Sequence, residues 1–347
     1  MVSLARQMML VRRVAFARRL AFVRRVVFAP RLAFALIATA VLCGTAFAQS
    51  WPARPVRVVV AFSAGGTTDL LARSVGQQLT SKLGQNFVID NRPGAGGNLG
   101  TEIVVRAAPD GYTLIVDSVG PIAVNPTLFP KLPYNPLTDL VPIAQIADVP
   151  NVLVVHPATP VATLEEFIAY AKANRGKLNY SSTGIGTSSH LSGFLLGKRA
   201  AIEATHIPYK GADALLDLLA GRVQFMFATI PSVKQHIDSG ALRALAVSSV
   251  TRSRSLPDVP TVAERGFPGF SAGSWFGFFA PKGTPPEVIA KLNKTVNEII
   301  DGPALQAQMI KEGADPAGGT PAEFAAFVQR EFEKWRAVVR ESGAVAE

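Results

Sequence analysis

Apolar and polar residues follow one another along the chain with the periods of strands and helices. From residue 56 onward, short apolar runs rich in valine and phenylalanine are followed by longer segments with one apolar face. Short buried strands that alternate with helices predict βαβ units and a mostly parallel sheet. The first series comprises strands at 56–62, 87–90 and 112–118 and helices at 68–83 and 97–108.

A second series begins after a proline- and asparagine-rich loop at 121–136 and an apolar, β-rich region at 140–156. It comprises strands at 178–182, 204–208, 223–228 and 242–248 and helices at 163–174, 188–199, 212–220 and 232–239. A chain with two such series is expected to form two α/β domains.

The C-terminal part combines a strand-like stretch at 270–281 with helices to the end of the chain. Thr163, Thr284 and Thr320 each precede a glutamate by three residues, which predicts capping boxes at three helix starts. The last helix carries its apolar residues on one face: Phe324, Phe327, Val328, Phe332, Trp335 and Val339. We expect this helix to pack back on the first domain. The chain would then cross twice, giving domain 1 at 49–152 and 273–347, domain 2 at 153–272, and a hinge.

The first 48 residues have the composition of an export signal. Residues 1–31 contain eight arginines and no acidic residue, and an apolar run at 32–43 follows. That run is too short to span a bilayer, and Ala46-Phe-Ala48 fits a cleavage site before Gln49. The predicted product is a periplasmic protein. The arginine pairs recur every six residues, so they belong either to a long leader or to a start codon placed too far upstream.

The leader also accounts for the basic charge of the chain. The whole sequence has 35 basic and 25 acidic residues, whereas the part after the leader has 27 and 25. The charge therefore gives no reason to expect nucleic-acid binding. The single cysteine, Cys43, lies in the leader, so the exported protein has no disulfide and no thiol, which suits an oxidising compartment.

Enzymatic motifs are missing from the sequence. It contains no phosphate-binding loop ending in Gly-Lys-Ser/Thr, no His-Glu-x-x-His and no cysteine nucleophile. Its Gly-x-Ser-x-Gly match, at 269–273, lies at the start of the strand-like stretch at 270–281 and not between a strand and a helix, as a nucleophile elbow would. The four histidines lack the spacing of metal ligands. A glycine-rich segment at 94–100 has the wrong spacing for a dinucleotide fingerprint, and close packing of a helix start on the sheet explains it better. We expect no catalysis, no cofactor and no metal.

Two glycine-containing segments stand where a strand runs into a helix. At 62–69 the sequence is Phe-Ser-Ala-Gly-Gly-Thr-Thr-Asp, and at 180–190 it is Tyr-Ser-Ser-Thr-Gly-Ile-Gly-Thr-Ser-Ser-His. The first amides of a helix have no internal partners, so such a segment can hold an anion. The alternative is a tight turn in which one hydroxyl caps the helix. Capping needs a single hydroxyl, however, and the second segment places five around its two glycines: those of Ser181, Ser182, Thr183, Thr187 and Ser188.

A further candidate is a possible third corner at 209–211, where a ring, an ammonium and an amide follow a strand; the alternative is a solvated loop lysine. Asn125, Ser118 and Trp275 are weaker candidates, each able to line a cleft or merely to pack. The predicted binding residues are Phe62, Gly65, Gly66, Thr67, Thr68, Asp69, Ser118, Asn125, Ser182, Thr183, Gly184, Thr187, Ser188, His190, Tyr209, Lys210 and Gly211.

Several of these segments together resemble the solute receptors of tripartite tricarboxylate transporters, also called Bug-type receptors. The resemblance extends over essentially the whole chain after the leader. It is carried by the Trp-Pro-x-Arg-Pro-Val start at 51–56 and by the segments 62–69, 91–98, 109–114, 180–191, 209–211, 256–262 and 280–285. This sequence has Ala64 where the family usually has proline, which frees an amide and loosens the first loop.

The resemblance implies a periplasmic binding protein of type II, a Venus flytrap that closes on a small organic acid. In that family the loops matching 62–69 and 181–190 face each other across the cleft and hold a carboxylate. The implied partners are the membrane components of a tripartite transporter or a sensor kinase, and the protein is expected to be a monomer. Two alternatives stay open: a receptor for an uncharged aromatic or amide solute, and an exported α/β enzyme acting on a small acid.

Overall fold

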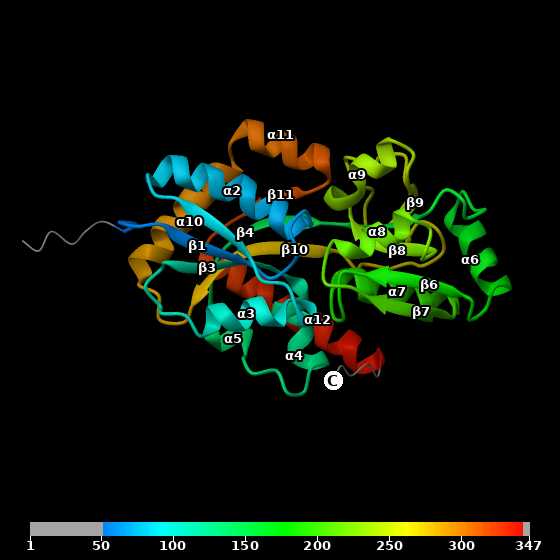
Figure 1. Cartoon of the computed structure of the whole chain (residues 1–347), viewed down its shortest axis with the longest axis horizontal. Coiled ribbons are helices and arrows are strands. Elements are labelled where there is room, and N and C mark those ends of the chain that lie inside the picture. Colours follow the sequence, from blue (N-terminus) through cyan, green and yellow to red (C-terminus); the bar gives the residue numbers. More distant parts are fainter. Residues whose placement is uncertain (1–50, 343–347) are drawn as a thin grey trace, which may run out of the picture. The chain divides into compact units, whose positions relative to one another are not determined.

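A six-stranded mixed sheet carries the N- and C-terminal parts of the described chain (Figure 1). The computed structural model describes residues 51–342, so the leader, its arginine pairs and the cleavage site lie outside the described residues. The strands are ordered β11-β4-β10-β3-β1-β2. Their bounds are β1 Val56–Val60, β2 Phe87–Asn91, β3 Thr113–Ser118, β4 Leu140–Val149, β10 Ser274–Pro281 and β11 Asp315–Gly318.

The helices that belong to this first sheet come from both ends of the chain. They are α2 Thr67–Leu83, the 3-10 turn η1 Ala95–Gly97, α3 Asn98–Val105, the π-helical turn η2 Gly120–Val124, α4 Asn125–Leu128, α5 Pro136–Asp139, α10 Pro286–Ile300, α11 Pro303–Glu312 and α12 Pro321–Ser342.

A five-stranded sheet is built from the middle of the chain, in the order β7-β6-β8-β5-β9. Its strands are β5 Asn151–Val155, β6 Leu178–Ser182, β7 Ala204–Pro208, β8 Phe225–Thr229 and β9 Arg243–Val247. Its helices are α6 Leu164–Ala173, α7 Ser188–Ala200, α8 Asp213–Leu219 and α9 Ile230–Asp238. Both sheets belong to one compact unit that begins at Pro52. The domain boundaries at 152/153 and 272/273 stay a prediction.

The expectation of mostly parallel sheets was wrong. In the first sheet β1 pairs parallel with β2 and β3, but β10 pairs antiparallel with β3 and β4, and β11 with β4. In the second sheet β5 pairs antiparallel with β8 and β9. The chain passes directly from β4 to β5 and returns in β10, and these connecting strands run against the βαβ strands.

The terminal helix α12 packs on the first sheet, as its apolar face predicted. Phe324 and Trp335 are buried, and the Trp275 ring on β10 meets the Phe324 ring edge-on at 5.8 Å. Glu331 of α12 accepts the indole hydrogen bonds of Trp275 at 3.2 Å and of Trp335 at 3.0 Å. Trp275 is therefore a core residue, anchored to α12.

Thr163 and Thr320 cap their helices as predicted, and at Thr320 the box is complete, because Glu323 also accepts the Thr320 amide at 2.8 Å. The Thr163 hydroxyl accepts the Glu166 amide at 3.2 Å, and the Thr320 hydroxyl accepts the Glu323 amide at 3.2 Å. The third predicted box was wrong, because the Thr284 hydroxyl donates to the Pro281 carbonyl and α10 starts one residue later without a side-chain cap. The strand β11 was also missed, since the C-terminal part was predicted to be wholly helical after β10. No helix within residues 51–342 combines the length and the apolar character needed to cross a membrane.

Candidate ligand-binding site

A small cavity of about 50 Å³ lies where loops of the two sheets meet. That volume is enough for a few water molecules. Its walls carry hydroxyls, glycines and two phenyl rings, and none of its lining residues is charged. The lining residues are Phe62, Gly66, Thr67, Thr68, Ser118, Thr183, Thr187, Ser188, Gly211, Ala212, Thr229, Ser274 and Phe276.

The first wall is the junction between β1 and α2. Gly65 turns the chain with a φ of 83°, a conformation that favours glycine, and Gly66 stands at the N-cap of α2. No side chain caps this helix. The first amides of α2 therefore keep their hydrogen-bonding capacity and their positive dipole for a ligand. Ala64 is exposed and does not line the cavity.

Asp69 braces this wall from behind. It is 3% exposed and accepts hydrogen bonds from the Gly65 amide at 2.9 Å, from Asn91 Nδ2 at 3.0 Å and from Arg73 Nε at 3.0 Å. Burial alone would favour the neutral acid, but these hydrogen bonds outweigh it and hold the pKa of Asp69 below its ordinary value. The carboxylate fixes the turn that presents the α2 amides.

The second wall is the loop between β6 and α7. Here Thr187 is the helix cap, because its hydroxyl accepts the His190 amide at 3.4 Å while donating to the Gly184 carbonyl at 2.7 Å. Ser182 is also occupied, since its hydroxyl donates to the Gly184 carbonyl at 3.1 Å and lies 2.6 Å from His206 Nε2. Capping and loop closure thus use two of the hydroxyls, and Thr183 remains available.

Four hydroxyls around the cavity have no hydrogen-bond partner among residues 51–342. They belong to Thr68, Ser118, Thr183 and Ser274, and all four residues line the cavity. None of the four is among the fully buried side-chain atoms that lack a partner, so these hydroxyls stay accessible from the cavity. Four accessible hydroxyls around one small cavity indicate a place that a polar ligand or water completes.

Direct hydrogen bonds join the loops of the two sheets beside the cavity. The Thr67 and Thr229 hydroxyls lie 2.7 Å apart, and the Ser63 hydroxyl donates to the Lys210 carbonyl. Glycine also permits the close approach, because a Cβ on Gly211 would lie 3.0 Å from the Ser63 amide nitrogen. In this arrangement the loops enclose the cavity from both sides.

The predicted binding residues divide into two groups. Nine of them line the cavity: Phe62, Gly66, Thr67, Thr68, Ser118, Thr183, Thr187, Ser188 and Gly211. Eight do not: Gly65, Asp69, Asn125, Ser182, Gly184, His190, Tyr209 and Lys210. Several of the second group hold the loops in place instead. Asn125 donates to Asn98 Oδ1 at 2.5 Å, and the Tyr209 hydroxyl donates to Asp217.

Four lining residues were not predicted: Ala212, Thr229, Ser274 and Phe276. Ser274 and Phe276 flank the core residue Trp275, and neighbouring side chains on a strand point to opposite faces. Placing Trp275 in the core therefore places Ser274 and Phe276 at the cavity. Thr229 is the last residue of β8 and stands directly before α9, so a third strand-to-helix junction was the signal for it.

Two histidines behind the second wall are held neutral. The rings of His190 and His206 stack with centroids 4.1 Å apart, and His190 Nδ1 accepts the Gly186 amide at 3.2 Å. Burial lowers the pKa of His190 to about 4, and burial together with the neighbouring His190 lowers that of His206 to about 3. Both imidazoles support the loop as uncharged rings.

This arrangement predicts a pH dependence of stability. A histidine whose pKa is lower in the folded state contributes stability that is fully present above its ordinary pKa of 6.5 and is lost as the pH falls towards the folded value. We expect the wild-type protein to lose about 2 kcal/mol more unfolding free energy than His206→Phe between pH 7.5 and 5. Urea unfolding at the two pH values measures this difference.

The comparison between variants is needed because two carboxyls act in the opposite direction. Burial raises the pKa of Asp117 to about 7 and that of Asp148 to about 6, so both stabilise the fold as the pH falls. Their contribution is the same in both proteins and cancels in the difference. Equal pH slopes for the two proteins would contradict the assignment of His206.

The family model of the tripartite tricarboxylate transporter family receptor matches residues 71–344. The chain belongs to this receptor family. It is 42% identical over 310 residues to Protein BugT of Bordetella pertussis. The aligned residues cover 89% of this chain and 95% of BugT. No group of three or more histidine, cysteine or acidic side chains within the described residues is arranged to hold a metal ion.

Solved structures of similar chains agree with this membership. R. palustris Rpa4515 with adipate superposes with a TM-score of 0.83 at 38% identity, covering 85% of this chain and 99% of that one. The periplasmic binding protein BugD superposes with a TM-score of 0.83 at 37% identity, covering 86% and 100%. With its two mixed α/β sheets, this receptor has the type II periplasmic-binding-protein fold, which confirms the predicted fold class.

Proposed function

We propose that this receptor captures a small organic carboxylate in the cavity between its two sheets and delivers it, in the periplasm, to the membrane components of a tripartite transporter. One observation carries the proposal: an uncharged cavity surrounded by unpartnered hydroxyls at the uncapped start of α2. The similar Rpa4515 protein, solved with adipate, supports the ligand class.

Neutral donors suffice to bind a carboxylate in such a cavity. The α2 amides and the hydroxyls of Thr68, Ser118, Thr183 and Ser274 surround the space from both sheets. A hydrogen bond to a charged group contributes roughly 1.5–3 kcal/mol, and a helix N-terminus favours negative charge. Because no lysine or arginine lines the cavity, binding does not require a buried ion pair, and the phenyl rings of Phe62 and Phe276 are left to contact the alkyl part of the ligand.

Ligand binding would favour closure of the two predicted domains about their hinge, and a membrane partner would recognise the closed shape. The hydrogen bonds from Thr67 to Thr229 and from Ser63 to Lys210 form only when the loops of the two sheets meet. Ligand that bridges the same loops therefore favours the closed arrangement.

Calorimetry with protein that has been unfolded, dialysed and refolded tests the ligand class. The titrants are acetate, succinate, adipate and citrate, with succinamide and adipamide as uncharged analogues of the same length. We expect saturable binding of at least one acid and none of its diamide. Binding of the diamides alone would favour the alternative of an uncharged solute, and turnover of a bound acid would favour an enzyme.

Replacing Thr183 with valine tests the second wall. Valine keeps the shape of threonine and removes only the hydroxyl, so we expect acid binding to weaken about 10- to 100-fold with an unchanged unfolding free energy. The matched control is Thr251→Val, at an exposed loop threonine away from the cavity. Calorimetry on both variants decides the point: equal affinities would remove Thr183 from the site.

Export is the remaining part of the proposal. We expect the leader to be removed after Ala48, so that the mature chain begins at Gln49. Intact mass and N-terminal sequencing of protein released from the periplasm measure this directly. A mass that includes the arginine-rich segment, or protein found only in the cytoplasm, would contradict it.

A further inference from the structure

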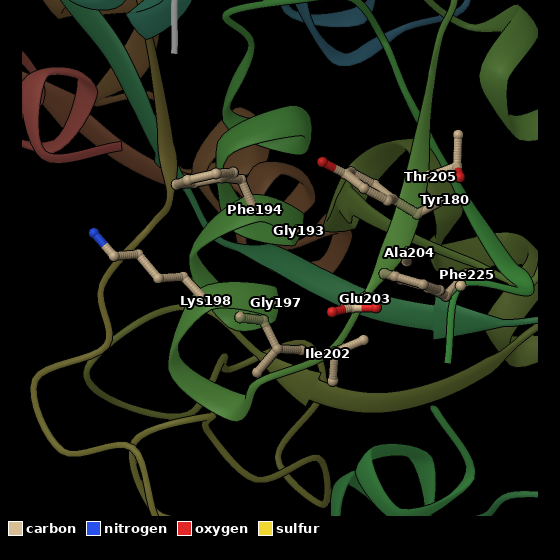
Figure 2. A pocket seen from close by; sticks show the side chains of 12 residues that line it. Tyr180, Gly193, Phe194, Gly197, Lys198, Ile202, Glu203, Ala204, Thr205 and Phe225 are labelled. Atoms are coloured by element: carbon tan, nitrogen blue, oxygen red, sulfur yellow. The ribbon is translucent and has the colours of Figure 1, made fainter. Parts of the chain in front are cut away.

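A second and larger pocket lies on the middle sheet, apart from the proposed carboxylate site. Its volume is about 460 Å³, within the usual range of small-molecule pockets, and it shares no lining residue with the cavity between the sheets. It opens between the helix α7 and the strands β6 and β7, and β7 is the edge strand of that sheet (Figure 2). Nothing in the proposed carboxylate-binding function uses this pocket.

The pocket exists because α7 has glycines where it faces these strands. Gly193 and Gly197 are one helical turn apart and both line the pocket. A Cβ on Gly193 would lie 2.6 Å from the Tyr180 ring, so only glycine allows the ring its place. Glycine in the middle of a helix lowers the stability by roughly 0.5–1 kcal/mol relative to alanine. The close packing of the Tyr180 ring explains why this helix has glycine here in spite of that loss.

The walls are mainly apolar and include two aromatic rings from neighbouring strands. Tyr180 on β6 stacks on Phe225 of β8 with ring centroids 5.3 Å apart and on His206 of β7 at 4.9 Å. Ile202 and Ala204 add aliphatic surface (Figure 2). Held between two rings, Tyr180 is fixed before any ligand arrives, which lowers the entropy lost on binding.

The Tyr180 side chain brings an unpartnered hydroxyl to the pocket. Tyr180 is 5% exposed, and its hydroxyl makes no hydrogen bond within residues 51–342. The hydroxyl points along the pocket towards Phe194 (Figure 2). Burial raises the pKa of Tyr180, so the group stays protonated and can both donate and accept.

The charged groups at the pocket are already engaged. Lys198 Nζ donates to the Glu341 carbonyl at 3.2 Å, and Glu203 forms an ion pair with Arg175. The charge of Glu203 is thus paired, and the Lys198 ammonium extends away from the Tyr180 ring (Figure 2). The site therefore suits an uncharged ring that carries a group for one hydrogen bond.

We propose that this pocket is a second binding site, and that it takes a small monocyclic aromatic alcohol of the phenol class. The ring packs among Phe225, Ile202 and Tyr180, and the ligand hydroxyl pairs with the Tyr180 hydroxyl. This site is independent of the carboxylate site, so it stands or falls separately from the proposed function.

An NMR titration of the ¹⁵N-labelled full-length mature protein tests the proposal with phenol and toluene as probes. The two probes have similar size, and only phenol forms the hydrogen bond. We expect phenol to shift the amide signals of Gly193, Gly197 and Ala204 and to bind two- to tenfold more tightly than toluene. In Tyr180→Phe the two affinities are expected to become equal.

A second variant fills the pocket. Ala204→Leu is expected to weaken phenol binding at least tenfold and to leave carboxylate binding unchanged, while the matched control Ala158→Leu, at an exposed loop position, is expected to alter neither. If Ala204→Leu does not fold, the ratio of phenol to toluene affinity in Tyr180→Phe decides. The proposal is overturned by phenol shifts confined to the cavity between the sheets, by absence of saturable shifts, or by an unchanged ratio in Tyr180→Phe.

Discussion

Replacing Gly186 with alanine is expected to weaken carboxylate binding at least 100-fold. Gly186 lies in the loop of the second wall with a φ of 81°, and a Cβ there would lie 1.9 Å from Asn125 Oδ1 on α4 of the first sheet. Asn125 has no room to move aside, because its Nδ2 is bonded to Asn98 Oδ1 at 2.5 Å and its side chain is fully buried. The variant therefore holds the two loops apart.

A separated pair of loops cannot share one carboxylate. Thr68 and Ser118 come from the first sheet, and Thr183 and Ser188 from the second. Losing two hydrogen bonds to a charged ligand, each contributing roughly 1.5–3 kcal/mol, accounts for the expected loss of affinity. Calorimetry with the acid that binds the wild-type protein measures it, and small-angle scattering is expected to show that added acid no longer compacts the variant.

The matched control is Gly240→Ala. Gly240 has a φ of 76°, so alanine there suffers the same backbone strain, but its Cβ would meet no atom within 4 Å. This variant is expected to lose some stability and to bind acid like the wild-type protein. Wild-type affinity in Gly186→Ala would show that the contact with Asn125 plays no part in closure. An equal loss in both variants would assign the effect to strain alone.

The local junctions of the fold were predictable from sequence. At the β1–α2 junction, the apolar strand, the glycine pair and the helix start are written in consecutive residues, and the structure places α2 at Thr67–Leu83 against a predicted 68–83. Hydroxyl-rich residues after a glycine turn identified both walls of the cavity. The sequence could not tell which hydroxyl serves as the cap, because Thr183, Thr187 and Ser188 have equivalent chemistry; only the geometry of Thr187 settles it.

Features that depend on pairing between distant segments were not predictable. The strand β10 is buried along its whole length, so its sequence shows no alternation that would reveal which residues face the cavity. Ser274 and Phe276 were missed for that reason. The antiparallel pairing of β10 with β3 and β4 joins residues more than a hundred positions apart, and no local pattern encodes it.

The Asn98 helix start shows the same limit. The glycines at 94–100 were expected to allow close packing, and a Cβ on Gly100 would indeed lie 2.7 Å from the Ala61 Cα. What the sequence could not show is that Gly96 approaches the other sheet, where a Cβ would lie 2.2 Å from the Ile185 carbonyl oxygen. Gly100 thus allows close packing beside the first sheet, and Gly96 allows the loops of the two sheets to approach each other.

Replacing Asp69 with alanine is expected to lower the unfolding free energy by about 2–4 kcal/mol and to weaken acid binding more than tenfold. The change removes the acceptor for the Gly65 amide, Asn91 and Arg73, so the turn before α2 loses its brace although no ligand contact is touched. Arg73 is half exposed and regains water, which keeps the loss below that of a fully buried ion pair. Urea unfolding and calorimetry at pH 7 measure the two effects.

The control is Asp238→Ala, which removes the acid of another pair spaced four residues apart, with Lys234. Asp238 is 56% exposed, so this variant is expected to lose less than about 1 kcal/mol and to bind acid normally. The pH provides a second check. Because the pKa of Asp69 is lowered in the folded state, its contribution is present above the ordinary value of 3.8 and disappears as the pH falls through the lowered one. The stability difference between wild type and Asp69→Ala should therefore shrink below pH 4. A difference that equals that of Asp238→Ala at pH 7, or that grows in acid, would contradict the role of Asp69 as the brace of the carboxylate site.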